Sequence, residues 1–189
     1  VPVGVTGASN VVNMLAGFNG LMSGLGIISC LSLTLVSLSL GQYTSAYLLL
    51  TMVGAQAAFH LFNRYPAKVF PGDTGTLSLG ALITAAIVVG NIEFWGVLFL
   101  GVHILNATMS LGSVGRFFEE KTFRKEKFSA LHIWEDGRIS FDVLEKPITL
   151  CKTFLYKRPQ MEYELTGRVC TLHALISVIF LLVFYFTTM

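Results

Sequence analysis

Four long runs of the sequence contain no charged residue and are mostly apolar, namely 21–40, 44–62, 95–115 and 169–189. A helix crosses the hydrocarbon core of a bilayer, about 30 Å thick, with about 20 residues. A fifth uncharged run, 74–90, is slightly shorter and leads into Asn91 and Glu93. Because backbone polar groups in lipid must be paired within the segment, runs of this length predict helices. The sequence therefore predicts an all-α polytopic membrane helix bundle with about five transmembrane helices.

The distribution of basic residues predicts the orientation of this bundle. All 13 Lys and Arg residues fall in the loop between the second and third predicted spans or in the segment 116–168. Because successive spans cross the membrane in opposite directions, both basic regions and the N-terminus are predicted to lie on the same side of the membrane. The turns on the other side, 41–43 and 91–94, contain no basic residue. The positive-inside rule then predicts one integral membrane domain over residues 1–189, with a cytoplasmic loop at 116–168 and the C-terminus outside.

The overall composition excludes some classes of function. Only 13% of the residues are charged and the formal net charge is +2, which is too small to indicate nucleic-acid binding. Membrane topology is the first explanation of the basic loop, and an anionic ligand is the second. The three cysteines have no spacing typical of a zinc site or a disulfide framework, so we interpret them as packing residues.

The polar loop contains a signal for a small β-hairpin. Residues 132–141 place Asp136 and Gly137 between β-prone residues. This pattern is typical of a hairpin with a two-residue type I′ turn.

Two polar segments rich in glycine lie at the predicted cytoplasmic ends of spans: NVVNMLAGFNG at 10–20 and FPGDTG at 70–75. The Asp73 carboxylate and the Asn13 amide oxygen are hard ligands suited to Mg²⁺, which typically uses one or two protein groups. Glycines allow the backbone to approach a diphosphate, and Phe70 offers a face for stacking a base.

Each of these residues also has a structural explanation when it is taken alone. An asparagine near a helix end is more often a cap than a ligand, and Gly-Asp-Thr-Gly alone is compatible with a capping turn. Phe70 could anchor the chain at the membrane interface, and basic residues could contact lipid headgroups. Their occurrence together at one membrane face favours a binding site.

The strings NVVNMLAGFNGL and FNRYPAKVFPGDTGTLSLG resemble the two signature regions in the second half of the polyprenyl-phosphate N-acetylhexosamine-1-phosphate transferase superfamily, or glycosyltransferase family 4. The version with Ala16 and Asn19 resembles the archaeal and eukaryotic branch that contains UDP-N-acetylglucosamine:dolichyl-phosphate N-acetylglucosamine-1-phosphotransferase. Bacterial relatives tend to have Asp at both positions. The resemblance covers nearly the whole chain.

The resemblance implies roles for individual residues. It assigns binding of Mg²⁺ or Mn²⁺ to Asp73 and Asn13. It assigns substrate binding to both signature regions and to two lysines of the polar loop: Asn10, Gly17, Asn19, Phe70, Lys125 and Lys127. Within this set, Asn19 would hydrogen-bond uracil, and Phe70 and Gly17 would sandwich the base.

The resemblance also implies a reaction. N-acetylglucosamine-1-phosphate would pass from UDP-N-acetylglucosamine to a polyprenyl, dolichyl-type phosphate, releasing UMP, as the first step of lipid-linked glycan assembly for protein glycosylation. The expected location is an archaeal plasma membrane or the endoplasmic reticulum, with the site facing the cytoplasm, and a homodimer is compatible with the family. Family members carry an acidic Asp-Asp motif in an upstream half, so the resemblance implies that this chain is the C-terminal half of a longer enzyme.

Two other classes of function remain open from the sequence. A transporter would also carry intramembrane polar residues, such as His103 and Asn106, although the simpler interpretation of these is interhelical hydrogen bonding. A noncatalytic membrane scaffold is the other alternative, because the acidic motif is missing from the sequence.

Overall fold

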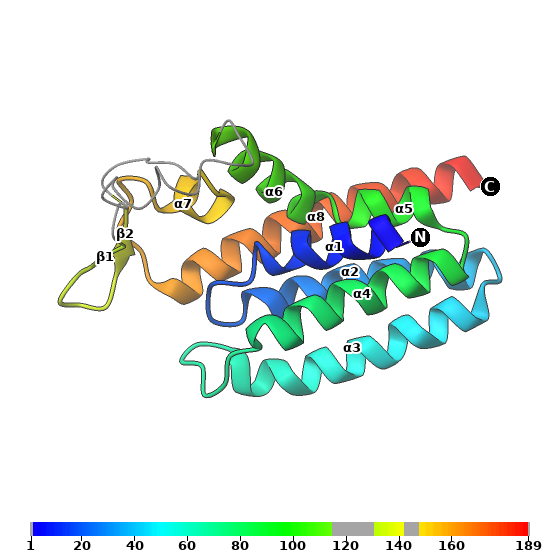
Figure 1. The fold of residues 1–189 in the computed structure, drawn as a ribbon, viewed down its shortest axis with the longest axis horizontal. Coiled ribbons are helices and arrows are strands. Elements are labelled where there is room, and N and C mark those ends of the chain that lie inside the picture. Colours follow the sequence, from blue (N-terminus) through cyan, green and yellow to red (C-terminus); the bar gives the residue numbers. More distant parts are fainter. Residues whose placement is uncertain (1, 115–130, 142–147, 189) are drawn as a thin grey trace.

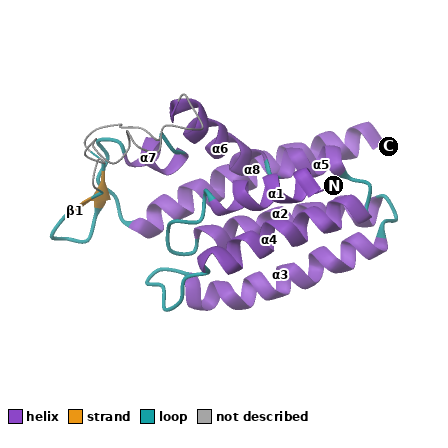
Figure 2. Ribbon diagram, in the orientation of Figure 1, coloured by secondary structure: helices purple, strands orange, loops and turns teal. Residues whose placement is uncertain are grey.

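The computed structural model describes residues 2–114, 131–141 and 148–188 (Figure 1). Within them are eight helices and two short strands, coloured by type in Figure 2. The elements are α1 Pro2–Asn13, α2 Leu21–Ser39, α3 Tyr43–Asn63, α4 Gly72–Val89, α5 Glu93–Phe99, α6 Gly101–Val114, β1 His132–Ile133, β2 Ile139–Ser140, α7 Leu150–Leu155 and α8 Glu162–Thr188. The predicted all-α bundle with a small hairpin is confirmed.

The helices α2, α3, α4 and α8 are each long and apolar enough to cross a bilayer. The pair α5 and α6 makes a fifth candidate span, bent by 66°. Large apolar side chains on these helices, such as Leu50 and Phe186, are exposed on the outer surface of the bundle, as expected where lipid replaces water. The chain is an integral membrane protein with four to five spans.

The bend lies inside the segment that the sequence predicts as one span, 95–115. Hydropathy alone does not show it, because the break at Leu100 and Gly101 contains no charge or proline. The carbonyl of Phe99, at the end of α5, accepts a hydrogen bond of 3.2 Å from the Ser29 hydroxyl on α2. A broken helix is tolerated in a membrane where neighbouring helices supply such partners.

Helix α1 lies antiparallel against α4, and the sequence did not predict it. The contact between the two backbones is close at Gly80, where an added Cβ would lie 2.5 Å from the Cα of Ser9. Asn13 contacts Thr76 near the beginning of α4, while Gly4 and Gly7 lie near Thr84 and its neighbours at the other end. Only a glycine at position 80 permits this approach.

The antiparallel packing corrects the predicted position of the N-terminus. The prediction placed it with the basic loops, but α1 runs toward those loops and begins at the opposite end of the bundle, where α8 ends (Figure 1). The prediction was wrong because it counted spans from residue 21 and treated residues 1–20 as an entry segment.

The hairpin is present, but its turn differs from the predicted one. Strands β1 and β2 pair antiparallel, with Ile133 opposite Ile139. The loop is longer than two residues: the N–H of Gly137 donates to the carbonyl of Trp134, and Gly137 is the only residue of this loop with a positive φ, of 81°. A type I′ turn would also need a positive φ at Asp136. The Asp136 carboxylate instead accepts hydrogen bonds from Arg138, and these contacts lower the pKa of Asp136.

The described residues of the polar segment after the bent span pair with the stretch of chain before α8. Ile139 of strand β2 pairs with Gln160, just before α8: the backbone N–H of each residue donates to the carbonyl of the other. Helix α8 begins at Glu162, so the last residues of the predicted loop 116–168 are helical.

The orientation of the bundle stays a prediction, and cysteine labelling tests it. In the chain with Lys68→Cys, an impermeant thiol reagent should react only after the membrane is opened, whereas Asn91→Cys should react in intact cells. The unmodified chain is a suitable control, because Cys30 and Cys151 are buried and Cys170 is partly buried. Burial also raises the pKa of the Cys151 thiol to about 12, which slows its reaction. The reverse labelling pattern would overturn the orientation.

Candidate functional site

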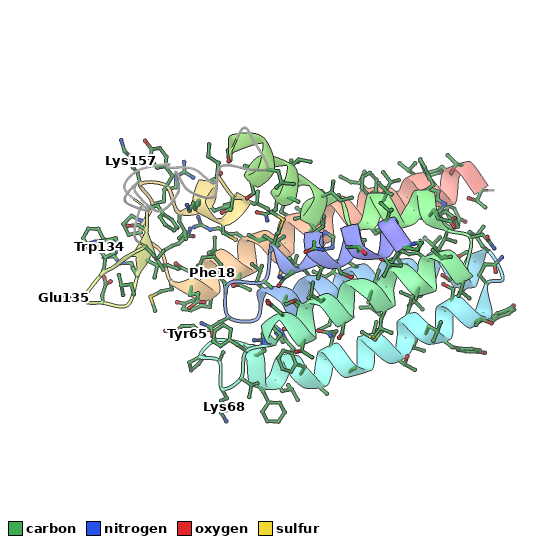
Figure 3. All side chains as sticks on the ribbon, viewed as in Figure 1. Phe18, Tyr65, Lys68, Trp134, Glu135 and Lys157 are labelled. Carbon is green, nitrogen blue, oxygen red and sulfur yellow. The ribbon has the colours of Figure 1, made fainter. Side chains whose placement is uncertain are left out.

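The two signature segments meet at one end of the bundle, the end that carries the basic loops. The first segment runs from the end of α1 through the loop 14–20, and the second comprises the loop 64–71 and the first turn of α4. Figure 3 shows Phe18 of the first loop and Tyr65 and Lys68 of the second at the same end of the bundle. The hairpin residues Trp134 and Glu135 lie beyond them at the same end.

Thr76 links the two predicted metal ligands, Asn13 and Asp73. The Thr76 hydroxyl donates to the Asn13 side-chain oxygen at 2.7 Å and is 3.2 Å from the Asp73 carbonyl oxygen, in the same turn of α4. The close packing of α1 on α4 at Gly80 holds the two helices at this distance. Asn13, at the end of α1, therefore lies beside the turn of α4 that carries Asp73.

The Asp73 side chain is exposed and makes no hydrogen bond or ion pair within the part of the chain that the structure describes. The Asn13 oxygen has a second lone pair besides the one that accepts from Thr76. Both groups are hard oxygen ligands, and this donor set fits Mg²⁺, which binds through one or two protein oxygens and completes its shell with waters and phosphates. Among the described residues, no cluster of three His, Cys, Asp or Glu side chains offers an alternative metal site.

A buried polar network fixes the second loop. The Ser23 hydroxyl on α2 lies 2.9 Å from the Asn63 side-chain oxygen and 2.8 Å from His60 Nδ1. The Asn63 amide nitrogen donates to the carbonyl of Val69 at 3.0 Å. Because this bond orients the Asn63 amide so that its oxygen faces Ser23, the single Ser23 hydrogen goes to Asn63, and His60 Nδ1 is the donor to Ser23. The network anchors the loop immediately before Phe70.

The entry to α2 needs a glycine at position 20. Gly20 has a φ of 74°, and an added Cβ would lie 3.2 Å from His60 Cε1 and 3.3 Å from the Arg64 Cα. The turn after Asn19 therefore brings the first loop directly against the end of α3.

Asn19 connects three parts of the site. Its side-chain oxygen accepts a hydrogen bond from the backbone N–H of Ala67 at 3.0 Å. Its backbone N–H donates to the Glu162 carboxylate at 2.7 Å, and its carbonyl accepts from the Thr166 hydroxyl at 3.0 Å. We call these three contacts the Asn19 junction. Within the described residues, the side-chain nitrogen of Asn19 donates no hydrogen bond.

The predicted base-binding residues are accessible. Phe70 is 56% exposed, and a Cβ added to Gly17 would meet nothing within 4 Å. Asn10 is also exposed, but its side-chain nitrogen donates to the carbonyl of Thr6 one turn earlier in α1. Lys125 and Lys127, the predicted diphosphate ligands, lie outside the described residues.

Asn106, on α6, also holds the end of α1 in place. Its side-chain nitrogen donates to the Met14 carbonyl at 3.1 Å, and its oxygen accepts from the Leu150 N–H at 2.9 Å. The side chain is fully buried. The predicted interhelical hydrogen bonding of Asn106 is confirmed, since the bond to Leu150 joins α6 to the first residue of α7, and the bond to Met14 joins α6 to the residue after α1.

Sequence reasoning missed most residues that hold the site together. Thr76 follows Asp73 by three residues, a helical spacing that could have identified it. Glu162, Thr166 and the pair of Ser23 and Asn63 act across long sequence separations, and no local pattern marks them.

The chain is similar in sequence to known transferases. Residues 1–91, which hold both signature segments, match glycosyl transferase family 4. A protein of Methanocaldococcus jannaschii named as a glycosyltransferase is 32% identical over 166 residues, which cover 87% of this chain and 52% of that protein. The phospho-N-acetylmuramoyl-pentapeptide-transferase of Geobacillus kaustophilus is 36% identical over 143 residues, 71% of this chain and 43% of that protein. The corresponding enzyme of Streptococcus equi subsp. zooepidemicus is 38% identical over 124 residues, 66% of this chain and 36% of that protein.

The chain belongs to the polyprenyl-phosphate N-acetylhexosamine-1-phosphate transferase superfamily. It spans about half the length, or less, of the curated relatives that it matches.

Proposed function

We propose that this chain provides the metal- and nucleotide-binding part of a membrane enzyme that transfers N-acetylglucosamine-1-phosphate from UDP-N-acetylglucosamine to a polyprenyl phosphate. The observation that carries the proposal is that Asn13, at the end of α1, contacts Thr76 in the turn of α4 that begins with Asp73. The family favours this reaction class over the transporter alternative.

The reaction is a phosphoryl transfer. An oxygen of the polyprenyl phosphate attacks the β-phosphorus of the nucleotide sugar, and the bond from this phosphorus to the UMP oxygen breaks. The products are UMP and a lipid-diphosphate-sugar. Asp73 and Asn13 would hold Mg²⁺ or Mn²⁺, which supplies charge compensation for the diphosphate.

The residues of the first loop would recognise the base. Because the Asn19 oxygen is bonded to Ala67, its side-chain nitrogen is the group that remains to donate to a uracil carbonyl. Phe70 is exposed and Gly17 leaves room for a flat ring, so both could contact the base faces. A donor at this position favours uracil over cytosine, which carries an amino group in place of one carbonyl.

The site also suits an acceptor that stays in the bilayer. Both signature loops lie at the ends of membrane-spanning helices, where a lipid phosphate can meet a soluble nucleotide sugar. Placement of this end in the cytoplasm follows from the basic loops and is part of the proposal.

The choice of N-acetylglucosamine rests on the motif with Ala16 and Asn19. Several relatives are named for transfer of a phospho-N-acetylmuramoyl-pentapeptide, so that donor is the direct competitor.

An assay of product identity tests the proposal. The natural protein, purified in detergent and given polyprenyl phosphate, should release UMP from UDP-N-acetylglucosamine faster than from UDP-N-acetylmuramoyl-pentapeptide. Removal of divalent ions with EDTA should stop the reaction, and Mg²⁺ or Mn²⁺ should restore it. Preference for the muramoyl donor would contradict the proposed substrate. Release of UDP in place of UMP would contradict the reaction class, and no turnover of either donor would favour a noncatalytic scaffold.

A further inference from the structure

The first turn of α8 lies against both signature loops, although it is distant from them in sequence. Glu162 and Thr166 are four residues apart, so they share one face of the helix. Both bond to the backbone of Asn19, from its two sides: the carboxylate accepts from the N–H at 2.7 Å and the hydroxyl donates to the carbonyl at 3.0 Å. One face of α8 thus holds a single residue of the first loop.

The same turn also contacts the second loop. The ring of Tyr163 lies against that of Tyr65, with centroids 5.6 Å apart and planes tilted by 54°. Since Asn19 in turn holds the N–H of Ala67, the second loop is connected to α8 both directly and through the first loop. The three segments form one connected unit at this end of the bundle.

Glu162 makes the charged contact of the Asn19 junction. A hydrogen bond to an ionised carboxylate is stronger than one between neutral groups. The neighbouring carboxylate, Glu164, has a different partner, since it accepts from the N–H of Met161 at the beginning of its own helix. The two glutamates therefore share a helix end, but only Glu162 reaches a signature loop.

We propose that Glu162 is a positioning residue for the nucleotide sugar, acting through Asn19, and that the first turn of α8 sets the distance between the two signature loops. This inference rests on the proposed function, because it assigns to Asn19 the recognition of uracil. With both backbone groups and the side-chain oxygen of Asn19 held, its side-chain nitrogen has a fixed direction. Loss of the Glu162 contact leaves only the bonds to Thr166 and Ala67 and so holds the side-chain nitrogen less firmly, which weakens donor binding before it affects the transfer step.

Kinetics of three variants test the inference in the natural protein. Glu162→Ala should raise KM for UDP-N-acetylglucosamine about tenfold while kcat changes by less than about twofold, as expected for loss of one charge-assisted hydrogen bond. Glu162→Gln keeps an acceptor oxygen and should restore most of the affinity. Glu164→Ala removes a carboxylate from the same helix end and should leave KM unchanged. An equal rise in KM for Glu164→Ala, or no rescue by glutamine, would overturn the inference.

Amide hydrogen exchange provides a readout that does not depend on turnover. In Glu162→Ala the N–H groups of Asn19 and Ala67 should exchange faster than in the parent, and in Glu162→Gln they should exchange at nearly the parent rate. Unchanged exchange in Glu162→Ala would overturn the inference even if KM rose. If the parent turned over no UDP-sugar, the proposed function would fail, and exchange would still decide whether Glu162 holds the loops.

Discussion

Replacing Asp73 with asparagine is expected to lower the rate of transfer by roughly three orders of magnitude, because a metal ion supplies several kcal/mol of charge stabilisation and each 1.4 kcal/mol is about a factor of ten. Asparagine has nearly the same shape but carries no charge. The Asp73 side chain is exposed and has no partner among the described residues, so the variant should fold and insert. Loss of the Asp73 charge from the first turn of α4 should lower the free energy of unfolding by at most about 1 kcal/mol.

The matched control for Asp73→Asn is Glu93→Gln. Glu93 is also an exposed carboxylate in the first turn of a helix, α5, but it lies at the opposite end of the bundle. UMP release by Glu93→Gln should equal that of the parent. Parent-like turnover in Asp73→Asn would refute the assignment of Asp73 to the metal.

The second large effect is expected for Gly80→Ala, a substitution outside the site. The new Cβ would lie 2.5 Å from the Ser9 Cα and 2.9 Å from the Ala8 carbonyl oxygen, and neither backbone atom can move without moving α1. Overpacking of this kind costs about 1–3 kcal/mol. Displacement of α1 also carries Asn13 away from Thr76 and Asp73, and a shift of about 1 Å can lower activity about a hundredfold.

Gly54→Ala is the control for this substitution. Gly54 lies within α3, where an added Cβ would meet nothing within 4 Å. Alanine is the better helix former, so Gly54→Ala should retain activity and should not lower the melting temperature. The comparison is made by UMP release and thermal unfolding of both variants. Equal behaviour of Gly80→Ala and Gly54→Ala would show that the α1–α4 contact does not position the site.

The membrane bundle could be predicted from the sequence because it depends on run length and charge, which are local properties. The bounds of α2, α3 and α4 follow the predicted spans closely. Helix α1 was missed because its twelve residues are too short for a span and are interrupted by Gly4 and Gly7. The bend after Phe99 was missed because hydropathy records how apolar a segment is and carries no information about its direction.

The site was predictable to a smaller extent. The motifs indicated that Asn13 and Asp73 belong together, and the structure brings both to the same end of α4. The groups that hold them there could not be read from the sequence. Ser23, Asn63 and Glu162 are ordinary residues in their local context, and their roles depend on contacts made only after the helices have packed.

The most direct measurement of the central claim is binding of Mn²⁺, a paramagnetic substitute for Mg²⁺, to the natural protein in the presence of UDP-N-acetylglucosamine. Electron paramagnetic resonance should show one bound ion per chain in the parent and in Glu93→Gln. If Asn13 and Asp73 hold the ion between α1 and α4, both Asn13→Ala and Asp73→Asn should lose it. Parent-like Mn²⁺ binding in both variants would contradict the account.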